Sequence, residues 1–318
     1  PEYESMWAFT GTIDNSDIGA TIAADSMCDN LGLDSISTGS TIGMAYELYE
    51  KGIITKADTD GLELVYSDPA PLIALIQKIA HREGFGDILA EGSRIAAKKI
   101  GRGAEYYAMQ VKGLELAAYE PRGLKATGYG YATSNIGASH GNGSLAFQEW
   151  GMPVPRAVDR FADDGKADIV AYNQDSSALS EVSMVCAFFN SFGPWYPTLI
   201  GKMLVAATGI QEFGDMRYLR KAGERIVNLE RAFNAREGIN RADDTLPERF
   251  RSEPLRTHGA PGDGQMVTRL DKFLDDYYDF RGWTRYGIPS REKLQELGLG
   301  FVVKDMEPLY AKYEKQIE

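Results

Sequence analysis

Residues 18–52 read IGATIAADSMCDNLGLDSISTGSTIGMAYELYEKG, and their apolar pattern decides the fold. Apolar side chains recur at helical spacing, first at Ile18, Ile22, Met27 and Leu31. This spacing predicts one helix over 18–31 and, after a short Gly-Leu turn, a second over 37–51. The second helix begins in hydroxyl-bearing residues that favour a helix start, and Gly52 favours its end. Two helices joined by a short turn are therefore expected here.

Helical periodicity continues along most of the chain, whereas strand signals are few and short. Further helices are predicted over residues 70–82, 87–100, 176–192, 196–208, 215–236, 266–278, 291–297 and 306–317. Residues 106–111 favour a short strand, and 249–264 form a loop rich in Pro and Gly. The expected fold class is mainly α.

The helix predicted over 215–236 carries the clearest apolar stripe. Its members are Met216, Leu219, Ala222, Ile226, Leu229 and Phe233, with Arg and Glu at the other positions. Such a helix is expected to turn the stripe toward a core.

The length of 318 residues suggests about two domains. The stretch from Val111 to Gly143 is rich in Gly and aromatic residues, and it is too rich in Gly to predict a helix. Glycine there allows the backbone to approach a ligand or another backbone closely. We place a boundary near Met109, which gives helical domains over 1–108 and 109–318.

Composition excludes several classes of protein. With 34 Lys and Arg against 46 Asp and Glu, the net charge of −12 argues against a nucleic-acid binder. The 2 cysteines and 3 histidines exclude a disulfide framework and a complete four-ligand zinc or iron–sulfur site. No apolar run reaches the roughly 18 residues of a membrane span, so a cytoplasmic protein is expected. The chain starts at Pro1 rather than Met, and we expect it to be part of something longer.

The turn between the first two helices is a candidate ligand site. Asp29 and Asp34 flank it, and the following helix opens with free amides and hydroxyls that suit a polar ligand. The alternative is purely structural, because Asp34 or a neighbouring serine could cap the second helix and Gly32 could end the first.

A second candidate is His140, which closes the stretch YATSNIGASH over residues 131–140. Small neighbours leave room for a bulky group, and histidine commonly donates a proton or hydrogen bond near neutral pH. A turn histidine without a role remains the alternative.

The remaining candidates are an acid and two thiols. Glu4 lies beside Tyr3 and Trp7, surroundings that could raise its pKa and make it a base, although a surface glutamate is the alternative. Cys186 lies in an apolar predicted helix, where an isolated cysteine is usually a small buried side chain. The same interpretation applies to Cys28.

Together these elements resemble one family. PEYES at residues 1–5, DNLGLDSISTG at 29–39, YATSNIGASH and then Cys186 follow the order and spacing of the tungsten- or molybdenum-pterin aldehyde ferredoxin oxidoreductases. That family has an N-terminal β domain, a cysteine segment that supplies three of four iron–sulfur ligands, and two mostly helical domains. Over almost its whole length the chain resembles the two helical domains alone.

The resemblance assigns roles to individual residues. Asp29, Leu33 and Asp34 match the first pterin-contacting element, and Glu4 with His140 matches the acid/base pair beside the metal. Cofactor-binding roles in the second part of the chain are implied for Asn142, Glu181 and Ala187.

Three of these positions carry residue types that differ from those common in the family. Asn142 lies in the segment where the family usually carries a basic residue near the cofactor. Glu181 stands where the family has an acid, commonly Asp, five residues before the cysteine. Ala187 replaces an apolar contact that is often Leu.

The resemblance also bears on metals. Cys186 matches the fourth ligand of the [4Fe–4S] cluster. Some relatives bind a further metal between subunits through a Glu that is Ala23 here, so no such metal is expected.

The function that the resemblance implies is oxidation of an aldehyde to a carboxylate. Electrons would pass through the cluster to ferredoxin, and the partners would be ferredoxin, a small aldehyde and the missing pterin-binding domain. The isolated chain is expected to be inactive, without complete pterin or cluster. Two alternatives stay open: a relative with another substrate, such as reduction of an aromatic acyl thioester, and a non-catalytic helical scaffold or binding subunit.

Overall fold

The computed structural model describes residues 1–186 and 198–314. The chain folds into two compact units. The first comprises Pro1–Tyr119, Gly137–Ser139 and Leu246–Glu253, and the second comprises Glu120–Ile136, His140–Thr245 and Pro254–Glu318. The sequence-based domains over 1–108 and 109–318 stay a prediction.

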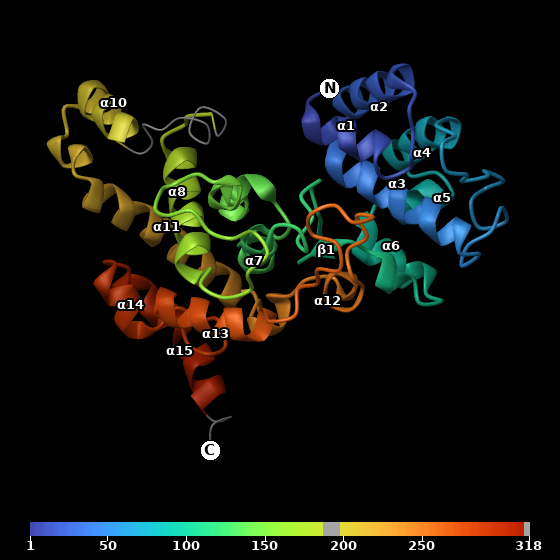
Figure 1. The fold of residues 1–318 in the computed structure, drawn as a ribbon. Coiled ribbons are helices and arrows are strands. Elements are labelled where there is room, and N and C mark those ends of the chain that lie inside the picture. Colours follow the sequence, from blue (N-terminus) through green and yellow to red (C-terminus); the bar gives the residue numbers. More distant parts are fainter. Residues whose placement is uncertain (187–197, 315–318) are drawn as a thin grey trace. The chain divides into compact units, whose positions relative to one another are not determined.

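The first unit is a cluster of helices with one small hairpin (Figure 1). Its elements are α1 (Tyr3–Thr10), α2 (Ile18–Leu31), α3 (Ser35–Glu50), α4 (Ala70–His81), α5 (Phe85–Leu89), α6 (Gly92–Ile100), the 3₁₀ turn η1 (Ala104–Tyr107), β1 (Gln110–Val111), β2 (Leu114–Glu115) and α12 (Glu248–Ser252). Helix α3 packs against α1, α2, α4 and α6, and a continuous apolar core fills the space between them.

The hairpin of β1 and β2 is antiparallel, with Gln110 opposite Glu115 and Val111 opposite Leu114. It delivers the buried Glu115 to the start of α6, where one carboxylate oxygen accepts from the backbone and the hydroxyl of Ser93 at 2.6 and 2.7 Å. A carboxylate at a helix N-terminus satisfies amides that the helix cannot. Glu115 is therefore a structural residue.

Most helices expected in this unit are confirmed. Helix α2 has the predicted bounds, and α3 begins two residues earlier than expected because Asp34 caps it. The single helix predicted over 87–100 is wrong: it divides into α5 and α6, since Gly92 adopts a φ of 79° that a continuous helix does not permit. The strand expected over 106–111 is limited to β1, after η1.

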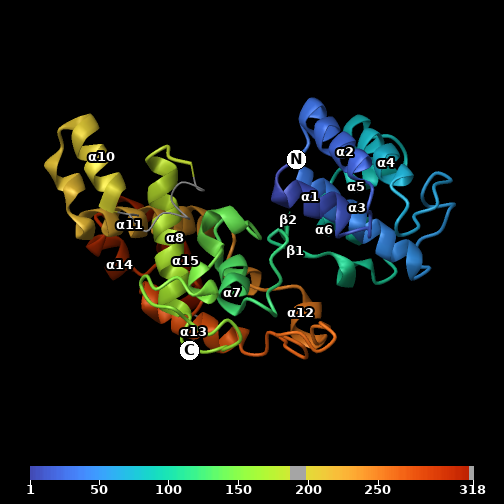
Figure 2. The same cartoon turned by 45° about the horizontal axis from the view of Figure 1, so that its top comes forward.

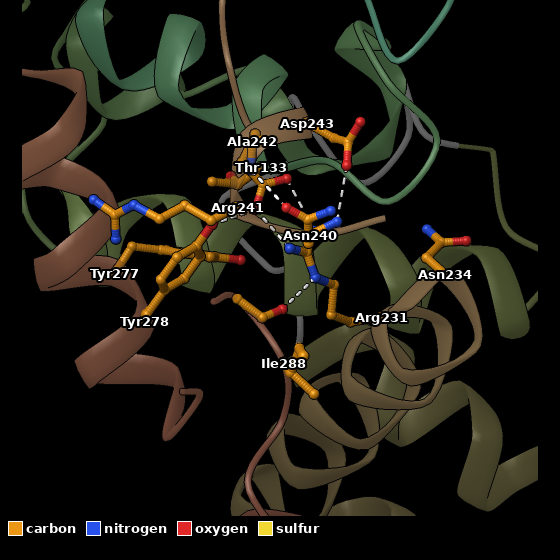
Figure 3. Close-up of polar contacts among 12 residues, drawn as sticks. Thr133, Arg231, Asn234, Asn240, Arg241, Ala242, Asp243, Tyr277, Tyr278 and Ile288 are labelled. Carbon is orange, nitrogen blue, oxygen red and sulfur yellow. Dashed lines mark hydrogen bonds and ion pairs between the residues drawn. The ribbon is translucent and has the colours of Figure 1, made fainter. Parts of the chain in front are cut away.

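The second unit is also helical. Its elements are α7 (Lys125–Thr133), the π-helical turn η2 (His140–Ser144), the 3₁₀ turn η3 (Phe147–Trp150), α8 (Ala167–Val182), α10 (Thr198–Thr208), the 3₁₀ turn η4 (Gln211–Gly214), α11 (Met216–Arg236), the 3₁₀ turn η5 (Arg241–Asp243), α13 (Leu270–Arg281), α14 (Arg291–Glu296) and α15 (Gly300–Glu314). Helices α8 and α11 pack side by side (Figures 1 and 2). After α11, Asn240 accepts from the backbone of Ala242 and donates its own backbone N–H to Asp243 (Figure 3).

Three expectations for this unit are wrong. The Gly-rich stretch contains a helix, α7, because Gly128 and Gly130 let it pack against Pro121 and Ser144. The helix predicted over 176–192 starts at Ala167 and ends at Val182, and residues 187–192 of that prediction lie outside the described residues. Cys186 therefore lies beyond its end rather than within it.

The third error concerns the stripe of α11. Leu229 and Phe233 are 41% and 55% exposed, whereas Asn228 and Arg231 are fully buried. Arg231 forms a two-pronged ion pair with Asp244 at 2.9 and 2.7 Å, and Asn228 accepts from Trp283. Because these polar side chains have complete partners, they occupy the core-facing positions.

Over residues 1–186 and 198–314, no helix combines the length and the apolar character that crossing a membrane requires.

Candidate functional site

Glu4 lies in the first turn of α1, which begins when the Glu2 side chain accepts from the Ser5 N–H. The Glu4 residue is 2% exposed, so it is not a surface glutamate. Its Oε2 accepts from the backbone N–H of Ala118 at 2.9 Å. Its Oε1 is buried and has no hydrogen-bond partner among residues 1–186 and 198–314. A buried carboxylate oxygen without a donor is costly, and it points to a partner that comes from outside these residues.

Burial is the main cause that raises the pKa of Glu4 above its ordinary value of 4.5. The hydrogen bond from Ala118 opposes this shift, and the negative charge of Glu2 adds to it. Burial also raises the pKa of the neighbouring Tyr119 to about 12, with Glu4 as the next contributor. Glu4 is therefore a carboxyl group placed to exchange a proton closer to neutrality than an exposed glutamate.

The turn between α2 and α3 has the geometry that the capping interpretation predicts. Gly32 ends α2 with a φ of 70°, and Asp34 caps α3 by accepting from the Ser37 N–H at 2.7 Å. Asp29 and Asp34 are exposed, and Leu33 is partly buried against the core of the first unit. The turn thus presents two carboxylates at the surface, and their predicted pterin contacts stay a prediction.

His140 begins the turn η2, which is wedged between α7 and α8. A Cβ on Gly130 of α7 would lie 2.6 Å from the Ser144 Cα, and one on Gly143 would lie 2.3 Å from the Gln174 Cα of α8. Gly143 also has a φ of 71°, which side-chain-bearing residues rarely adopt. The glycines noted in the sequence therefore allow close backbone packing, which fixes the turn that carries the half-buried His140.

Asn142 and Glu181 are brought together in the second unit. The Asn142 amide donates to Glu181 Oε1 at 3.3 Å, and the Ser177 hydroxyl donates to the same oxygen at 3.1 Å. The single Ser177 hydroxyl proton is shared with the Gly141 carbonyl, which lies 2.8 Å away. Loss of hydration raises the pKa of Glu181, and the negative charge of Glu230 raises it further. Sequence spacing gave no sign of this contact.

Glu149 anchors the helix that precedes the His140 segment, and sequence reasoning missed it. Its buried carboxylate accepts from the backbone of Ala126 and Thr127 in the first turn of α7, at 2.8 and 3.2 Å. Lys166, itself buried, pairs with it at 3.0 Å. No local pattern marks Glu149, because its partners lie about twenty residues away on both sides.

The two cysteines have different surroundings. Cys28 is fully buried, and burial raises the pKa of its thiol to about 12, so it is a poor metal ligand. Cys186 is exposed, and its thiol is accessible to a partner. Ala187 lies outside the described residues. In the described part of the chain no three His, Cys, Asp or Glu side chains are grouped to hold a metal. Cys186 thus fits the chemistry of one cluster ligand.

The candidate residues divide between the units. Glu4, Asp29, Leu33 and Asp34 belong to the first, and His140, Asn142, Glu181 and Cys186 belong to the second. For a pterin the available groups are chemically suitable, since exposed carboxylates and an amide oxygen can accept from the amino and ring N–H groups of such a molecule.

Comparisons with known proteins agree on one family. Residues 1–299 match the family model "Aldehyde ferredoxin oxidoreductase, domains 2 & 3". The chain is 43% identical over 302 residues to a tungsten-containing aldehyde ferredoxin oxidoreductase of Pyrococcus furiosus, covering 94% of this chain and 48% of that protein. It is 31% identical over 314 residues to the WOR-like subunit of an aliphatic sulfonate oxidoreductase of the same organism, covering 94% and 46%.

A solved structure is similar too. The chain matches the active-site complex BamBC of benzoyl coenzyme A reductase, determined with 1,5-dienoyl-CoA, with a TM-score of 0.74 and 26% identity. The match covers 96% of this chain and 49% of that one. The chain thus spans about half the length of the relatives that it matches.

Proposed function

This chain belongs to the aldehyde ferredoxin oxidoreductase family, and we propose that it forms the C-terminal part of a tungsten- or molybdenum-pterin enzyme that oxidises aldehydes to carboxylates. The observation that carries the proposal is Glu4, a buried carboxylate with a raised pKa and one unpartnered oxygen, at the position that the family resemblance assigns to a base. The 43% identity to a tungsten-containing relative supports the choice of reaction.

Glu4 supplies the proton acceptor. Oxidation of an aldehyde to a carboxylate adds one water oxygen to the carbonyl carbon and releases two electrons and three protons, one of which is lost by the product acid. Oε1 takes a proton from that water, while Oε2 stays fixed by the Ala118 N–H. Because burial raises the Glu4 pKa, the carboxylate is a stronger base than an exposed glutamate.

His140 supplies the hydrogen bond to the substrate oxygen. An imidazole N–H donated to the carbonyl oxygen draws electron density from the carbonyl carbon and favours attack by water. The rigid packing of η2 between α7 and α8 keeps the donor in place as charge develops.

The cofactor would be held in part by residues of this chain. Asp29, Leu33, Asp34, Asn142 and Glu181 would contact the pterin, and Cys186 would supply one thiolate to a [4Fe–4S] cluster. When bound, the metal–pterin group and the cluster supply the two-electron redox chemistry that no side chain provides. The proposal also includes ferredoxin as electron acceptor, the pterin-binding N-terminal region as partner and a cytoplasmic location.

Turnover of the complete protein that carries this chain tests the reaction. With a viologen acceptor, aldehydes should be oxidised, and His140→Ala should lower kcat about 10²-fold or more, the range of a positioned acid or hydrogen-bond donor. His81→Ala is the matched control, since His81 ends α4 in the other unit. Unchanged kcat in His140→Ala would contradict the assigned role.

A relative with another substrate is the second candidate function. The likeness to the benzoyl coenzyme A reductase complex favours it, as does Asn142 in place of a basic residue. The same assay with aromatic acyl thioesters discriminates between the two. Turnover of thioesters without turnover of aldehydes would replace the first proposal.

The isolated chain offers a separate test of the cluster assignment. Iron and sulfide added to residues 1–318 should give no stable absorbance of the 4Fe type, because a cluster needs four ligands and only Cys186 is accessible. A robust cluster in the isolated chain would contradict the proposal. A non-catalytic scaffold would instead leave turnover intact after both His140→Ala and Glu4→Gln.

A further inference from the structure

A buried chain of hydrogen bonds runs through the second unit to the end of α7. Arg281 of α13 donates to the hydroxyl oxygen of Tyr277 and to Oε1 of Gln174, at 3.1 and 2.8 Å. The Tyr277 hydroxyl donates to the same Gln174 oxygen. The Gln174 amide nitrogen then donates to Thr133 Oγ1 at 3.1 Å. All four side chains belong to buried residues.

The donor and acceptor roles along this hydrogen-bond chain are fixed. Arginine carries donors only, so Arg281 needs acceptors, and its remaining bonds go to Asp175 at 2.6 Å and to the Ala171 carbonyl at 3.3 Å. The Tyr277 hydroxyl accepts from Arg281 and donates its proton to Gln174. The Thr133 hydroxyl donates its proton to the Tyr129 carbonyl, 2.9 Å away, and therefore accepts from Gln174. The carbonyl end of the Gln174 amide thus faces α13, and its NH₂ end faces α7.

Gln174 also touches the segment that carries His140 at both of its ends. Thr133 is the last residue of α7, directly before the stretch that leads to His140. Gly143, three residues after His140, packs against the backbone of Gln174 so closely that a Cβ would lie 2.3 Å from its Cα. One residue of α8 therefore contacts both the entry and the exit of the His140 segment.

We propose that Gln174 is a positioning residue for His140, holding the segment between Thr133 and Gly143 against α8 through a hydrogen-bond chain that starts at Arg281. The inference rests on the proposed function, in which His140 touches the substrate. It adds that the orientation of the imidazole depends on the Gln174–Thr133 bond, which lies outside the reacting groups.

Thr133→Val in the complete protein tests the link. Valine keeps the shape of threonine but removes the acceptor of the Gln174 amide. The expected result is a fall of about tenfold in kcat with little change in KM, because misplacement of a catalytic group lowers rate rather than binding. Thr133→Ser keeps the hydroxyl and should restore kcat. Thr59→Val is the matched control, since Thr59 is an equally buried threonine of the first unit whose hydroxyl bonds the Leu62 carbonyl.

A spectroscopic readout separates this inference from the proposed reaction. The imidazole resonances of His140, assigned by their loss in His140→Gln, should shift in Thr133→Val and in Gln174→Glu and should stay in place in Thr59→Val. Unmoved His140 resonances in Thr133→Val would overturn the inference, even if the complete protein oxidises aldehydes. A kcat lowered equally in Thr133→Val and Thr59→Val would overturn it as well. Shifted resonances in a protein without aldehyde turnover would support the positioning role and contradict the proposed reaction.

Discussion

Helix α1 and the interior of the second unit both bury carboxylates, but they treat them differently. In the second unit Asp244 receives two bonds from Arg231 and one from Tyr278, and Glu149 receives bonds from Lys166 and from the start of α7. Among the described residues, Glu4 of α1 receives a hydrogen bond from Ala118 alone. The paired carboxylates stabilise the fold, whereas one oxygen of the Glu4 carboxylate has no hydrogen-bond donor among the described residues.

The physical reason lies in desolvation. A buried charge is tolerated when an opposite charge and hydrogen bonds replace its water, and an unmet buried acceptor costs about 1–3 kcal/mol. Glu115 makes the same point within the first unit, since it is as buried as Glu4 but accepts from both groups of Ser93. Burial alone therefore does not distinguish the two carboxylates, whereas the incomplete partnering of Glu4 does.

The largest loss of stability is expected when one of the paired carboxylates is removed. Asp244→Ala leaves Arg231 buried without its counter-charge, and the free energy of unfolding should fall by about 3–5 kcal/mol. Denaturant unfolding measures it. A loss below about 1 kcal/mol would mean that the Arg231–Asp244 pair is not what holds α11 to the following loop.

A smaller loss is expected where η2 meets α8. Gly143→Ala places a Cβ 2.3 Å from the Gln174 Cα at a φ of 71°, so both overlap and backbone strain oppose it. We expect a destabilisation of about 2–4 kcal/mol, measured by the same unfolding curves. Gly151→Ala has positive φ but open space, and should lose only about 1 kcal/mol. Equal losses would show that the close packing of η2 contributes nothing.

Glu4→Gln should instead raise the stability of the protein at neutral pH. Because the folded-state pKa of Glu4 is raised, the folded protein binds the proton more tightly, and stability falls as pH rises from 4.5 through the folded-state pKa. The variant removes this loss, so its melting temperature should exceed that of the original protein at neutral pH and equal it at acid pH. A lower melting temperature at neutral pH would show that the Glu4 charge stabilises the fold.

The smallest effect is expected from the ion pair of Arg217 and Asp215. Arg217 is almost fully exposed, with a side-chain exposure of 92%, and water and salt screen the pair. Arg217→Ala should leave the melting temperature unchanged within error. A clear decrease would mean that exposed pairs of this chain matter as much as buried ones.

The sequence predicted the elements whose signals are local. The bounds of α2, the glycine end at Gly32 and the capping of α3 followed from neighbouring residues. The environment of Glu4 could not be predicted from pattern, because its donor Ala118 lies 114 residues further along the chain. Its aromatic neighbours and the family resemblance both singled out Glu4, and the structure added its burial and its unpartnered oxygen.

The failures share a cause. The apolar stripe of α11 was misplaced because Arg231 and Asn228 become core residues only through Asp244 and Trp283, which lie in loops after α11. The helix around Cys186 was extended too far because apolar residues continue past Val182, where α8 ends. Buried polar partners and helix ends are decided by tertiary contacts that a periodic pattern does not contain.

Aldehyde turnover by Glu4→Gln in the complete protein tests the central claim most directly. If Glu4 is the proton acceptor, kcat should fall by about 10²–10⁴-fold, while Glu115→Gln, a buried glutamate with complete partners in the same unit, should retain kcat within about twofold. A Glu4→Gln enzyme that oxidises aldehydes as fast as the original would contradict the account.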